Sequence, residues 1–307
     1  GAATQDVELT DTNVLAADLN TLNDYTIGDI DASTVAEIEG TVTALNTAYD
    51  TAGINGLGNE AVTITDTTAA VADLVTLDGN TSGVIDASAA HTLSGTVSNA
   101  NSVYASDGFT GLGAEAVTLT DTSLSDVADL NTLNGYTTGN IDASEITSLT
   151  GSISDLNTAY GSASALGNGI SGLGNETVTI DDTASIDASA LNTLNGYTTG
   201  NVDATTAESF TGTISDLNTL YAAAASSGDG IKGLGSEAVT VTDSSVSASD
   251  LNTLNTKTDY NITVNATAIS GSLSDVSTLY GNKAADSNAA TDGFTGLGNE
   301  AITVSDT

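Results

Sequence analysis

The sequence predicts a repeat solenoid of the α/β kind, a parallel β-solenoid with short helices between its strands. A 12-residue segment returns at offsets of 55, 61, 61 and 63 residues. Each unit contains strand-like and helix-like stretches in one fixed order, and only 4% of the residues are aromatic. Stacked repeats of small aliphatic side chains build a thin, regular core without large rings. An all-β right-handed parallel β-helix is the alternative fold.

The first segment of each unit reads GLGNEAVTITDT and predicts a strand. Val62 and Ile64 alternate with Thr63 and Thr65, the period-two pattern of a strand with one buried face. GLG opens a strand, so it predicts a corner that needs glycine and not a phosphate loop. Copies start at Gly56, Gly111, Gly172, Gly233 and Gly296, and a degenerate copy, TQDVELTDT, starts at Thr4.

A helical stretch is expected after the first strand. Residues 123–134 read SLSDVADLNTLN, with Leu130 and Leu133 at i, i+3 spacing, Ser123 as a cap for the first turn and Gly135 as the C-terminal cap.

Two further segments complete each unit. GNIDAS at residues 139–144 predicts the second strand, and LTGSIS at 149–154, followed by DLNTAY, predicts the third. In the fifth copy, TVNAT at Thr263 puts Asn265 where the other copies have Asp. The stretch before GLG varies in length, which predicts a surface loop.

We expect a single continuous solenoid over residues 1–307, with repeat units of approximately 4–58, 59–113, 114–174, 175–235 and 236–298, and with 299–307 starting a sixth. Two stackings are open. Each strand could form its own rung, or a whole repeat could form one coil in which like strands stack on like. We favour the first.

Charge excludes several classes of function. The chain has 40 acidic residues against three Lys and a net charge of −37, which excludes nucleic-acid binding and adhesion to anionic membranes. No apolar run is long enough for membrane insertion. The absence of Cys and the single His91 exclude thiol chemistry and structural zinc, and carboxylates that repeat do not mark one active centre. We therefore expect no enzyme and read His91 as a surface substitution.

Carboxylates recur at fixed places and are the candidate metal ligands. If equivalent Asp side chains stack, they repel, and calcium with oxygen ligands would bridge neighbouring turns. The alternative is that they are turn and helix-cap residues, since neither a DxDxDG loop nor a GGxGxD repeat is present. Glu60, Glu115, Glu176, Glu237 and Glu300 form a further set before the first strand. The candidate calcium ligands are Asp11, Asp66, Asp121, Asp182, Asp243 and Asp306 after the first strand, and Asp31, Asp86, Asp142 and Asp203 after the second.

Tyrosines and threonines also recur. The Tyr residues end the third segment of every unit, so a ladder that binds carbohydrate, as in an adhesin, competes with simple packing. They are Tyr49, Tyr104, Tyr160, Tyr221 and Tyr280. T-x-T pairs such as Thr63 with Thr65 resemble the arrays of ice-binding solenoids, against strand propensity as the plain explanation.

The runs ADLNTLNGYTTGNIDAS, LTGSISDLNTAY and GLGNEAVTLTDT resemble the Ser/Thr/Asp-rich repeats of very large secreted surface proteins of cyanobacteria and other aquatic bacteria, often grouped with hemolysin-type calcium-binding proteins. The resemblance covers essentially the whole chain and implies export, an extracellular or cell-surface location and calcium dependence. The chain starts and stops in one phase of the repeat, which predicts two open sheet edges. We expect a structural protein that forms a filament, sheath or surface layer, with copies of itself, or further repeats of a longer chain, as partners.

Overall fold

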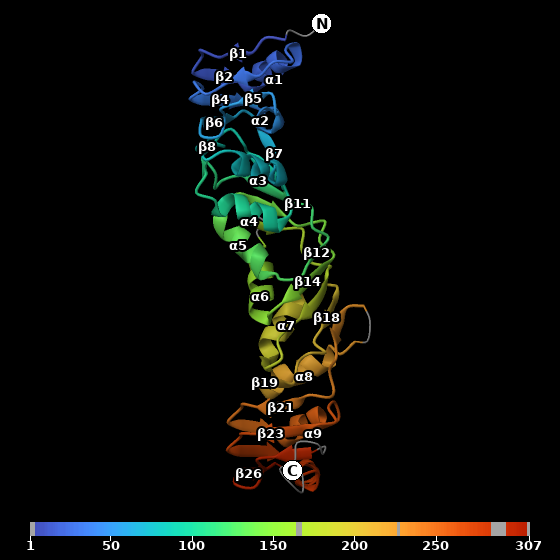
Figure 1. The fold of residues 1–307 in the computed structure, drawn as a ribbon. Helices are drawn as coiled ribbons and strands as arrows, with labels where there is room; N and C mark the ends of the chain where they lie inside the picture. The colour runs from blue at the N-terminus through green and yellow to red at the C-terminus, as the bar shows by residue number, and fades with distance from the viewer. Residues whose placement is uncertain (1–3, 164–167, 226–227, 284–292, 306–307) are drawn as a thin grey trace. The chain divides into compact units, whose positions relative to one another are not determined.

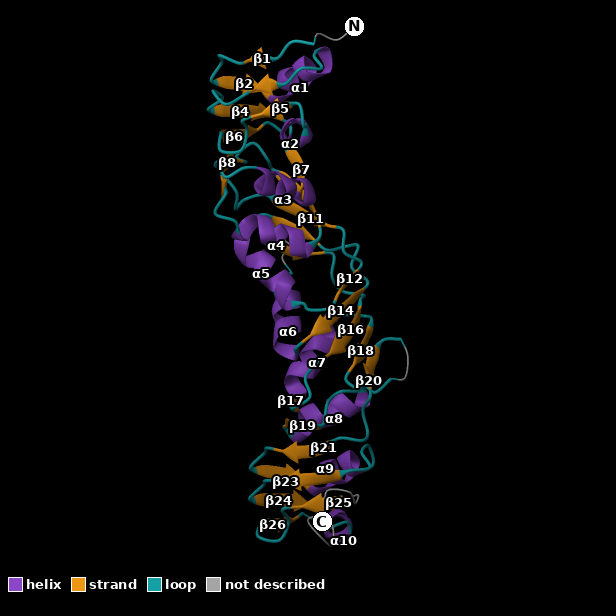
Figure 2. Cartoon of the chain, viewed as in Figure 1, coloured by secondary structure: helices purple, strands orange, loops and turns teal. Residues whose placement is uncertain are grey.

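The predicted α/β solenoid is confirmed: a computed structural model shows short parallel strands alternating with short helices (Figures 1 and 2). The structure describes residues 4–163, 168–225, 228–283 and 293–305. Contacts divide the chain into unit 1, with Gly1–Thr122, Asp129–Ile146 and Ser162–Gly172, and unit 2, with Ser123–Ala128, Thr147–Gly161 and Leu173–Thr307.

Ten helices lie within the described ranges. Most of their buried side chains belong to the repeated stretches that read DLNTL or a close variant. In α7, for example, Leu191 and Leu194 are fully buried at i, i+3 spacing. None of the described helices is long and apolar enough to cross a lipid bilayer. The helices are α1 (Ala16–Tyr25), α2 (Val42–Asp50), α3 (Val71–Asn80), α4 (Val97–Ala105), α5 (Ala128–Tyr136), α6 (Ile153–Gly161), α7 (Ala188–Tyr197), α8 (Ile214–Ala222), α9 (Ala248–Asn255) and α10 (Leu273–Gly281).

Unit 1 contains one three-stranded and two five-stranded parallel sheets. The three-stranded sheet is β1 (Val7–Glu8), β3 (Ile30–Asp31) and β5 (Ile54–Asn55). The second sheet is β2 (Asn13–Leu15), β4 (Glu37–Gly40), β6 (Ala61–Ile64), β8 (Ile85–Asp86) and β10 (Phe109–Thr110). The third sheet is β7 (Thr68–Ala70), β9 (Thr92–Gly95), β11 (Ala116–Leu119), β13 (Asn140–Asp142) and β15 (Gly169–Ser171).

Unit 2 contains two five-stranded sheets and ends in a three-stranded one. The first is β12 (Ser123–Leu124), β14 (Ser148–Gly151), β16 (Thr177–Ile180), β18 (Asn201–Asp203) and β20 (Gly230–Lys232). The second is β17 (Ser185–Asp187), β19 (Ser209–Gly212), β21 (Ala238–Val241), β23 (Asn261–Val264) and β25 (Gly293–Thr295). The last is β22 (Ser245–Ser247), β24 (Ala268–Gly271) and β26 (Ala301–Val304).

The register shows that a coil is about half a repeat. Val62 pairs with Ile38 on one side and with Ile85 on the other, so neighbouring strands lie 24 and 23 residues apart. Strands of different kinds therefore pair, and like strands do not stack on like. Neither stacking considered from the sequence is right, because each coil supplies strands to two or three sheets.

Every five-stranded sheet has the same order of strand kinds. We call the short strand between a first-segment strand and the next helix the lead strand, and the short strand just before GLG the corner strand. Across each sheet the order is lead strand, third-segment strand, first-segment strand, second-segment strand and corner strand. The sheet β2-β4-β6-β8-β10 illustrates the order. The two three-stranded sheets are parts of it: β1-β3-β5 has the last three kinds, and β22-β24-β26 has the first three.

Three local predictions need correction. Residues 123 and 124 form β12 and α5 begins only at Ala128, because Leu124 is buried as a strand residue; Gly135 lies inside the helix. In the second strand of the fifth copy, Thr263 and not Asn265 takes the Asp position, since Ile262 pairs with Val239.

The GLG corner is confirmed. Gly56 has a φ of 93° and Gly58 a φ of 140°, and a Cβ on Gly56 would lie 2.7 Å from the backbone nitrogen of Ser33. The surface-loop prediction for the stretch before GLG falls in part on residues 164–167, 226–227 and 284–292, outside the described residues.

Candidate assembly interface

The Asp residues after the first strand cap helices of the preceding coil. The Oδ2 atom of Asp66 accepts a 2.7 Å hydrogen bond from the backbone N–H of Val42, the first residue of α2. That helix also has its local cap, because Thr41 accepts from the N–H of Ala44. A carboxylate at a helix N-terminus satisfies a free N–H and offsets the positive end of the helix dipole. The same bond joins Asp121 to Val97, Asp182 to Ile153 and Asp243 to Ile214.

The two end members of this set differ. Asp11 lies in the first described coil, where no earlier helix precedes it, and it lines a shallow hollow with Leu9 and Leu15. Asp306 lies outside the described residues. The hydrogen bonds of the other four Asp residues join one coil to the preceding one. A sequence pattern for local helix caps does not reveal such a contact.

The Asp residues of the second strand form tight turns. Asp86 accepts a 2.9 Å hydrogen bond from the backbone N–H of Ser88, and this bond holds its pKa below the usual value. The hydrogen bonds from Ser33 lower the pKa of Asp31 in the same way. Asp142 accepts from the N–H of Ser144.

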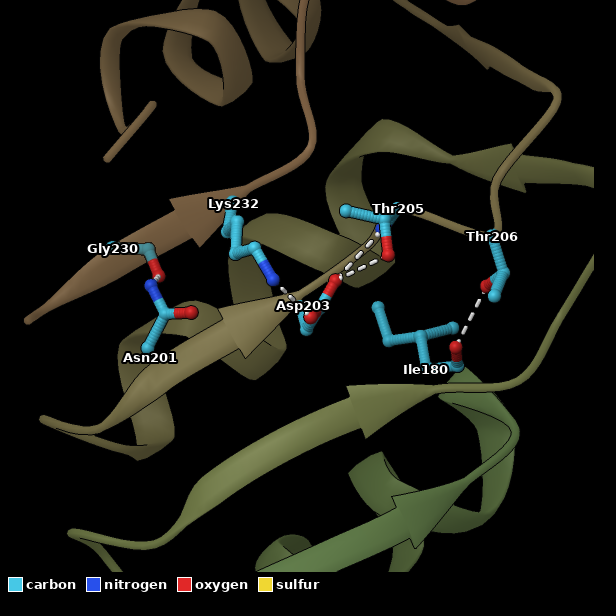
Figure 3. A network of polar contacts seen from close by, with 7 residues as sticks. All are labelled: Ile180, Asn201, Asp203, Thr205, Thr206, Gly230 and Lys232. Atoms are coloured by element: carbon cyan, nitrogen blue, oxygen red, sulfur yellow. Dashed lines mark hydrogen bonds and ion pairs between the residues drawn. The ribbon is translucent and has the colours of Figure 1, made fainter. Parts of the chain in front are cut away.

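Asp203 also forms an ion pair with a lysine side chain. Its Oδ2 atom lies 2.7 Å from Nζ of Lys232 on the next strand, and its Oδ1 accepts from the N–H and the hydroxyl of Thr205 (Figure 3). Burial opposes the charge of Asp203, but these partners lower its pKa overall. Figure 3 also shows Asn201 reaching the carbonyl of Gly230, so polar side chains connect successive coils.

The register separates equivalent Asp side chains of neighbouring coils. Asp142 lies in register between Thr118 and Ser171, so equivalent Asp side chains do not stack and the expected repulsion is absent. Calcium takes about six to eight oxygen ligands. Among the described residues, no three His, Cys, Asp or Glu side chains gather as a metal site. Caps and turns engage the described members of both sets except Asp11. Calcium binding stays a prediction.

A second set of carboxylates is buried beside the glycine corner. The side chain of Glu176 accepts hydrogen bonds from the N–H of Gly174 and from the hydroxyl of Tyr160, the latter at 2.7 Å. Glu60, Glu115, Glu176 and Glu237 are only 1–4% exposed. The equivalent phenol contacts are Tyr49 with Glu60, Tyr104 with Glu115, Tyr221 with Glu237 and Tyr280 with Glu300.

This Tyr–Glu–Gly corner joins the end of one helix to the start of the next first-segment strand. Burial, with the nearby charge of Glu115, raises the pKa of Tyr104; in the less enclosed last copy, burial and Glu300 raise the pKa of Tyr280 to about 12. The sequence contained the signal, a Tyr and a GLGxE at matching places in each unit. The sequence predicts packing or carbohydrate binding for these Tyr residues but not the Glu partner.

The Tyr hydroxyls expected to form a carbohydrate-binding ladder instead donate hydrogen bonds to the Glu residues of these corners. Tyr160 stacks on Tyr197 with ring centroids 5.8 Å apart, and Tyr104 stacks on Tyr136 at the same distance. The rings therefore pack in pairs, and the outer ring of each pair, Tyr136 or Tyr197, is about 40% exposed.

Asparagines connect successive helices, a role that sequence reasoning missed. In the D-L-N-T run of α8, Nδ2 of Asn218 donates to the backbone carbonyl of Asp250 in α9. The Asn in these runs therefore recurs because helices of adjacent coils lie side by side. The other bonds are Asn20 to Ala44, Asn46 to Asp73, Asn101 to Asp129, Asn157 to Ala190, Asn192 to Asp216 and Asn252 to Asp275.

The last strand exposes side chains that are buried in the four preceding full copies of the first segment. Val62 and Ile64 of β6 are each 1% exposed, whereas Ile302 and Val304 at the equivalent positions of β26 are 47% and 48% exposed. The difference arises because β6 lies between two strands, while β26 pairs with β24 alone among the described residues. Within the same described part of the chain, β1 pairs with β3 alone, and Leu15 is 49% exposed.

Comparison with models of known protein families gives no match, and comparison with curated proteins gives none.

Proposed function

We propose that this chain is a non-enzymatic structural repeat protein that self-assembles head to tail into an extracellular filament, sheath or surface layer. The observation that carries the proposal is the exposure of Ile302 and Val304, whose equivalents are buried under a following coil in the four preceding full copies of the first segment. One more coil of the same kind covers them best, and either a second copy of the chain or a further repeat of a longer chain supplies such a coil.

The end strands also offer unpaired backbone groups. In β6, the N–H of Val62 donates to the carbonyl of Val84 in the following coil. The equivalent donor of β26 faces the open edge, and an open edge is a template for strand addition. A contact between different ends of two copies is heterologous and repeats without closing, which produces a fibre.

The free energy gained by burying each exposed apolar side chain of β26 is small compared with the cost of association. Burying the exposed half of one aliphatic side chain contributes about 1 kcal/mol. Losing the freedom of a free molecule costs about 4 kcal/mol or more. Ile302 and Val304 alone therefore do not hold two copies together, and backbone pairing and coil-on-coil packing must add to them. Assembly is expected to depend strongly on concentration.

The chemistry of the described residues supports a structural role. The repeated carboxylates are engaged as caps, turns and corners, and the Asn and Tyr residues hold coils to each other. The extracellular location rests on the acidic composition and on the family resemblance, and the partners are further copies or further repeats of the same kind.

Sedimentation velocity over a concentration series tests the self-assembly. The 307-residue chain should shift to larger species as concentration rises, and Ile302→Asp should stay monomeric, because the substitution places a charge in the junction. Val84→Asp is the matched control, since Val84 is 53% exposed away from the ends, and it should assemble normally. A chain that stays monomeric at every concentration would overturn the proposal.

Ice binding is a second candidate, and one row of side chains favours it. Thr211, Thr240, Thr263 and Thr295 follow one another in register on one sheet, at the strand spacing of about 4.8 Å. A thermal-hysteresis measurement decides: a depressed freezing point that Thr240→Lys abolishes would support ice binding, and no hysteresis would exclude it.

A further inference from the structure

We propose that the stacked tyrosine pairs are sites of oxidative crosslinking, at which a one-electron oxidant joins two rings into dityrosine and so links successive helices covalently. The pairs are Tyr104 with Tyr136 and Tyr160 with Tyr197. Each pair lies within one chain, so the proposal is independent of self-assembly.

The composition directs oxidants to tyrosine. Thiols, thioethers and indoles are the side chains that compete with phenols for an oxidant, and this chain has no Cys, Met or Trp. It has nine Tyr and a single His. Oxidising equivalents that reach the chain are therefore expected to collect on its tyrosines.

The geometry of the pairs brings together two phenols from different helices. In each pair the ring centroids are 5.8 Å apart, and the ring planes differ by 10° in the first pair and by 4° in the second. Parallel rings at this centroid distance are offset, with their edges close to each other. The outer rings, Tyr136 and Tyr197, are 40% and 41% exposed and have room to slide toward their partners. A bond between the rings would join α4 to α5 and α6 to α7.

The inner ring of each pair already has a proton acceptor. The hydroxyl of Tyr160 donates a 2.7 Å hydrogen bond to Glu176, and that of Tyr104 donates a 2.9 Å bond to Glu115. A phenol that loses an electron becomes a strong acid, and a carboxylate at hydrogen-bond distance takes up its proton directly. The oxidised inner ring is therefore expected to form a neutral phenoxyl radical.

The step balances with two equivalents of a one-electron oxidant. Each phenol of a pair gives one electron to the oxidant and its hydroxyl proton to a base, which is the Glu carboxylate for the inner ring and water for the outer ring. The two radicals combine at ring carbons next to the C–O groups and form one carbon–carbon bond. The hydrogen on each of these carbons then shifts to the oxygen and restores the phenol, so the chain loses two electrons and two protons overall.

Other tyrosines of the chain separate pairing from exposure. Tyr49 has a carboxylate partner, Glu60, at 3.0 Å, but within the described residues no aromatic ring stacks on it. Tyr25 is 69% exposed, the highest fraction among the tyrosines, and it too stacks on no described ring. Crosslinking directed by the pairs spares both residues, whereas oxidation that follows exposure attacks Tyr25 first.

Peptide mapping after controlled oxidation tests the assignment. The full chain, at low concentration, is illuminated with a ruthenium tris(bipyridine) complex and persulfate, and the monomeric band of a denaturing gel is cleaved at acidic residues. Mass spectrometry should find linked peptides, lighter by two hydrogen atoms, for Tyr104 with Tyr136 and for Tyr160 with Tyr197. Links that involve Tyr25 as often as these pairs would overturn the proposal, as would absence of the expected links at a dose that dimerises added N-acetyltyrosinamide.

Phenylalanine variants of the full chain give a second readout, the fluorescence of dityrosine. Tyr197→Phe removes one outer phenol and should lower this fluorescence by about half, because two pairs contribute to it. Tyr25→Phe is the control and should leave the fluorescence unchanged. Equal losses in the two variants would show that exposure, and not stacking, directs the oxidation.

The carboxylate is tested by comparing the two pairs within one molecule. Glu176→Gln removes the base beside Tyr160 and should slow the linking of Tyr160 with Tyr197 by about tenfold or more, relative to the linking of Tyr104 with Tyr136. The unaltered pair also reports that the rest of the fold is intact. Equal rates for the two pairs would overturn the assignment of the carboxylate as the base.

Discussion

The phenol of Tyr160 donates a 2.7 Å hydrogen bond to the carboxylate of Glu176, and both side chains are nearly fully buried. Glu176 is fixed in turn by the N–H of Gly174, whose positive φ of 140° shapes the corner. The contact joins the last turn of α6 to the start of β16. Five such corners recur among the described residues, so each repeat has its own Tyr–Glu contact.

Removing the phenol oxygen should destabilise the corner. Tyr160→Phe keeps the ring packed on Tyr197 but takes a donor from a buried carboxylate, which costs about 1–3 kcal/mol. Chemical denaturation monitored by circular dichroism measures the change. Tyr197→Phe is the control and should cost less, because Tyr197 is the outer, half-exposed ring of the pair. Equal costs for the two variants would contradict the role assigned to the corner.

The corners also predict loss of stability in alkali. Burial and the contact with Glu176 raise the pKa of Tyr160 above its ordinary value of 10.0. The unfolded chain therefore loses the phenol proton at lower pH than the folded chain does. The resulting stability is complete below pH 10 and is lost as the pH rises toward the folded pKa. Melting temperature measured from pH 8 to 12 should fall less steeply in Tyr160→Phe than in the unaltered chain; parallel curves would refute this explanation.

Two glycines of the same repeat should respond in opposite ways to alanine. A Cβ on Gly200 would overlap the carbonyl oxygen of Glu176 in the neighbouring coil, so Gly200→Ala should destabilise strongly or prevent folding. Gly196 lies in α7 with no atom near its added Cβ, and Gly196→Ala should stabilise by about 0.5–1 kcal/mol. Thermal melting of both variants checks the pair, and similar effects would contradict the coil register.

A chelator distinguishes calcium bridging from caps and turns. Because Asp182 caps α6 and Asp142 lies between hydroxyl residues, removal of calcium should leave the melting midpoint unchanged. A ligand bound only by the folded chain raises the midpoint by mass action. A midpoint that rises with added calcium and falls with EDTA would show that cations do hold the Asp residues.

The sequence predicts the strands and the repeat well, because Val62 and Ile64 alternate with threonines and their neighbours repeat the pattern. It misses the half-repeat coil, since the pairing of Val62 with Ile38 and Ile85 depends on which segments meet in space. That error also made the Asp residues look stacked. The bond from Asp66 to Val42 spans 24 residues between coils, which no local capping pattern reports. Likewise the burial of Glu176 follows from the corner and not from its polarity.

The claim that end strands pair between copies is tested most directly by amide hydrogen exchange of the full chain, dilute and concentrated. At high concentration the amide of Ile302 should become protected, as it gains the kind of acceptor that Val62 finds in the carbonyl of Val84. Unchanged exchange of Ile302 in assembled chains would contradict the account.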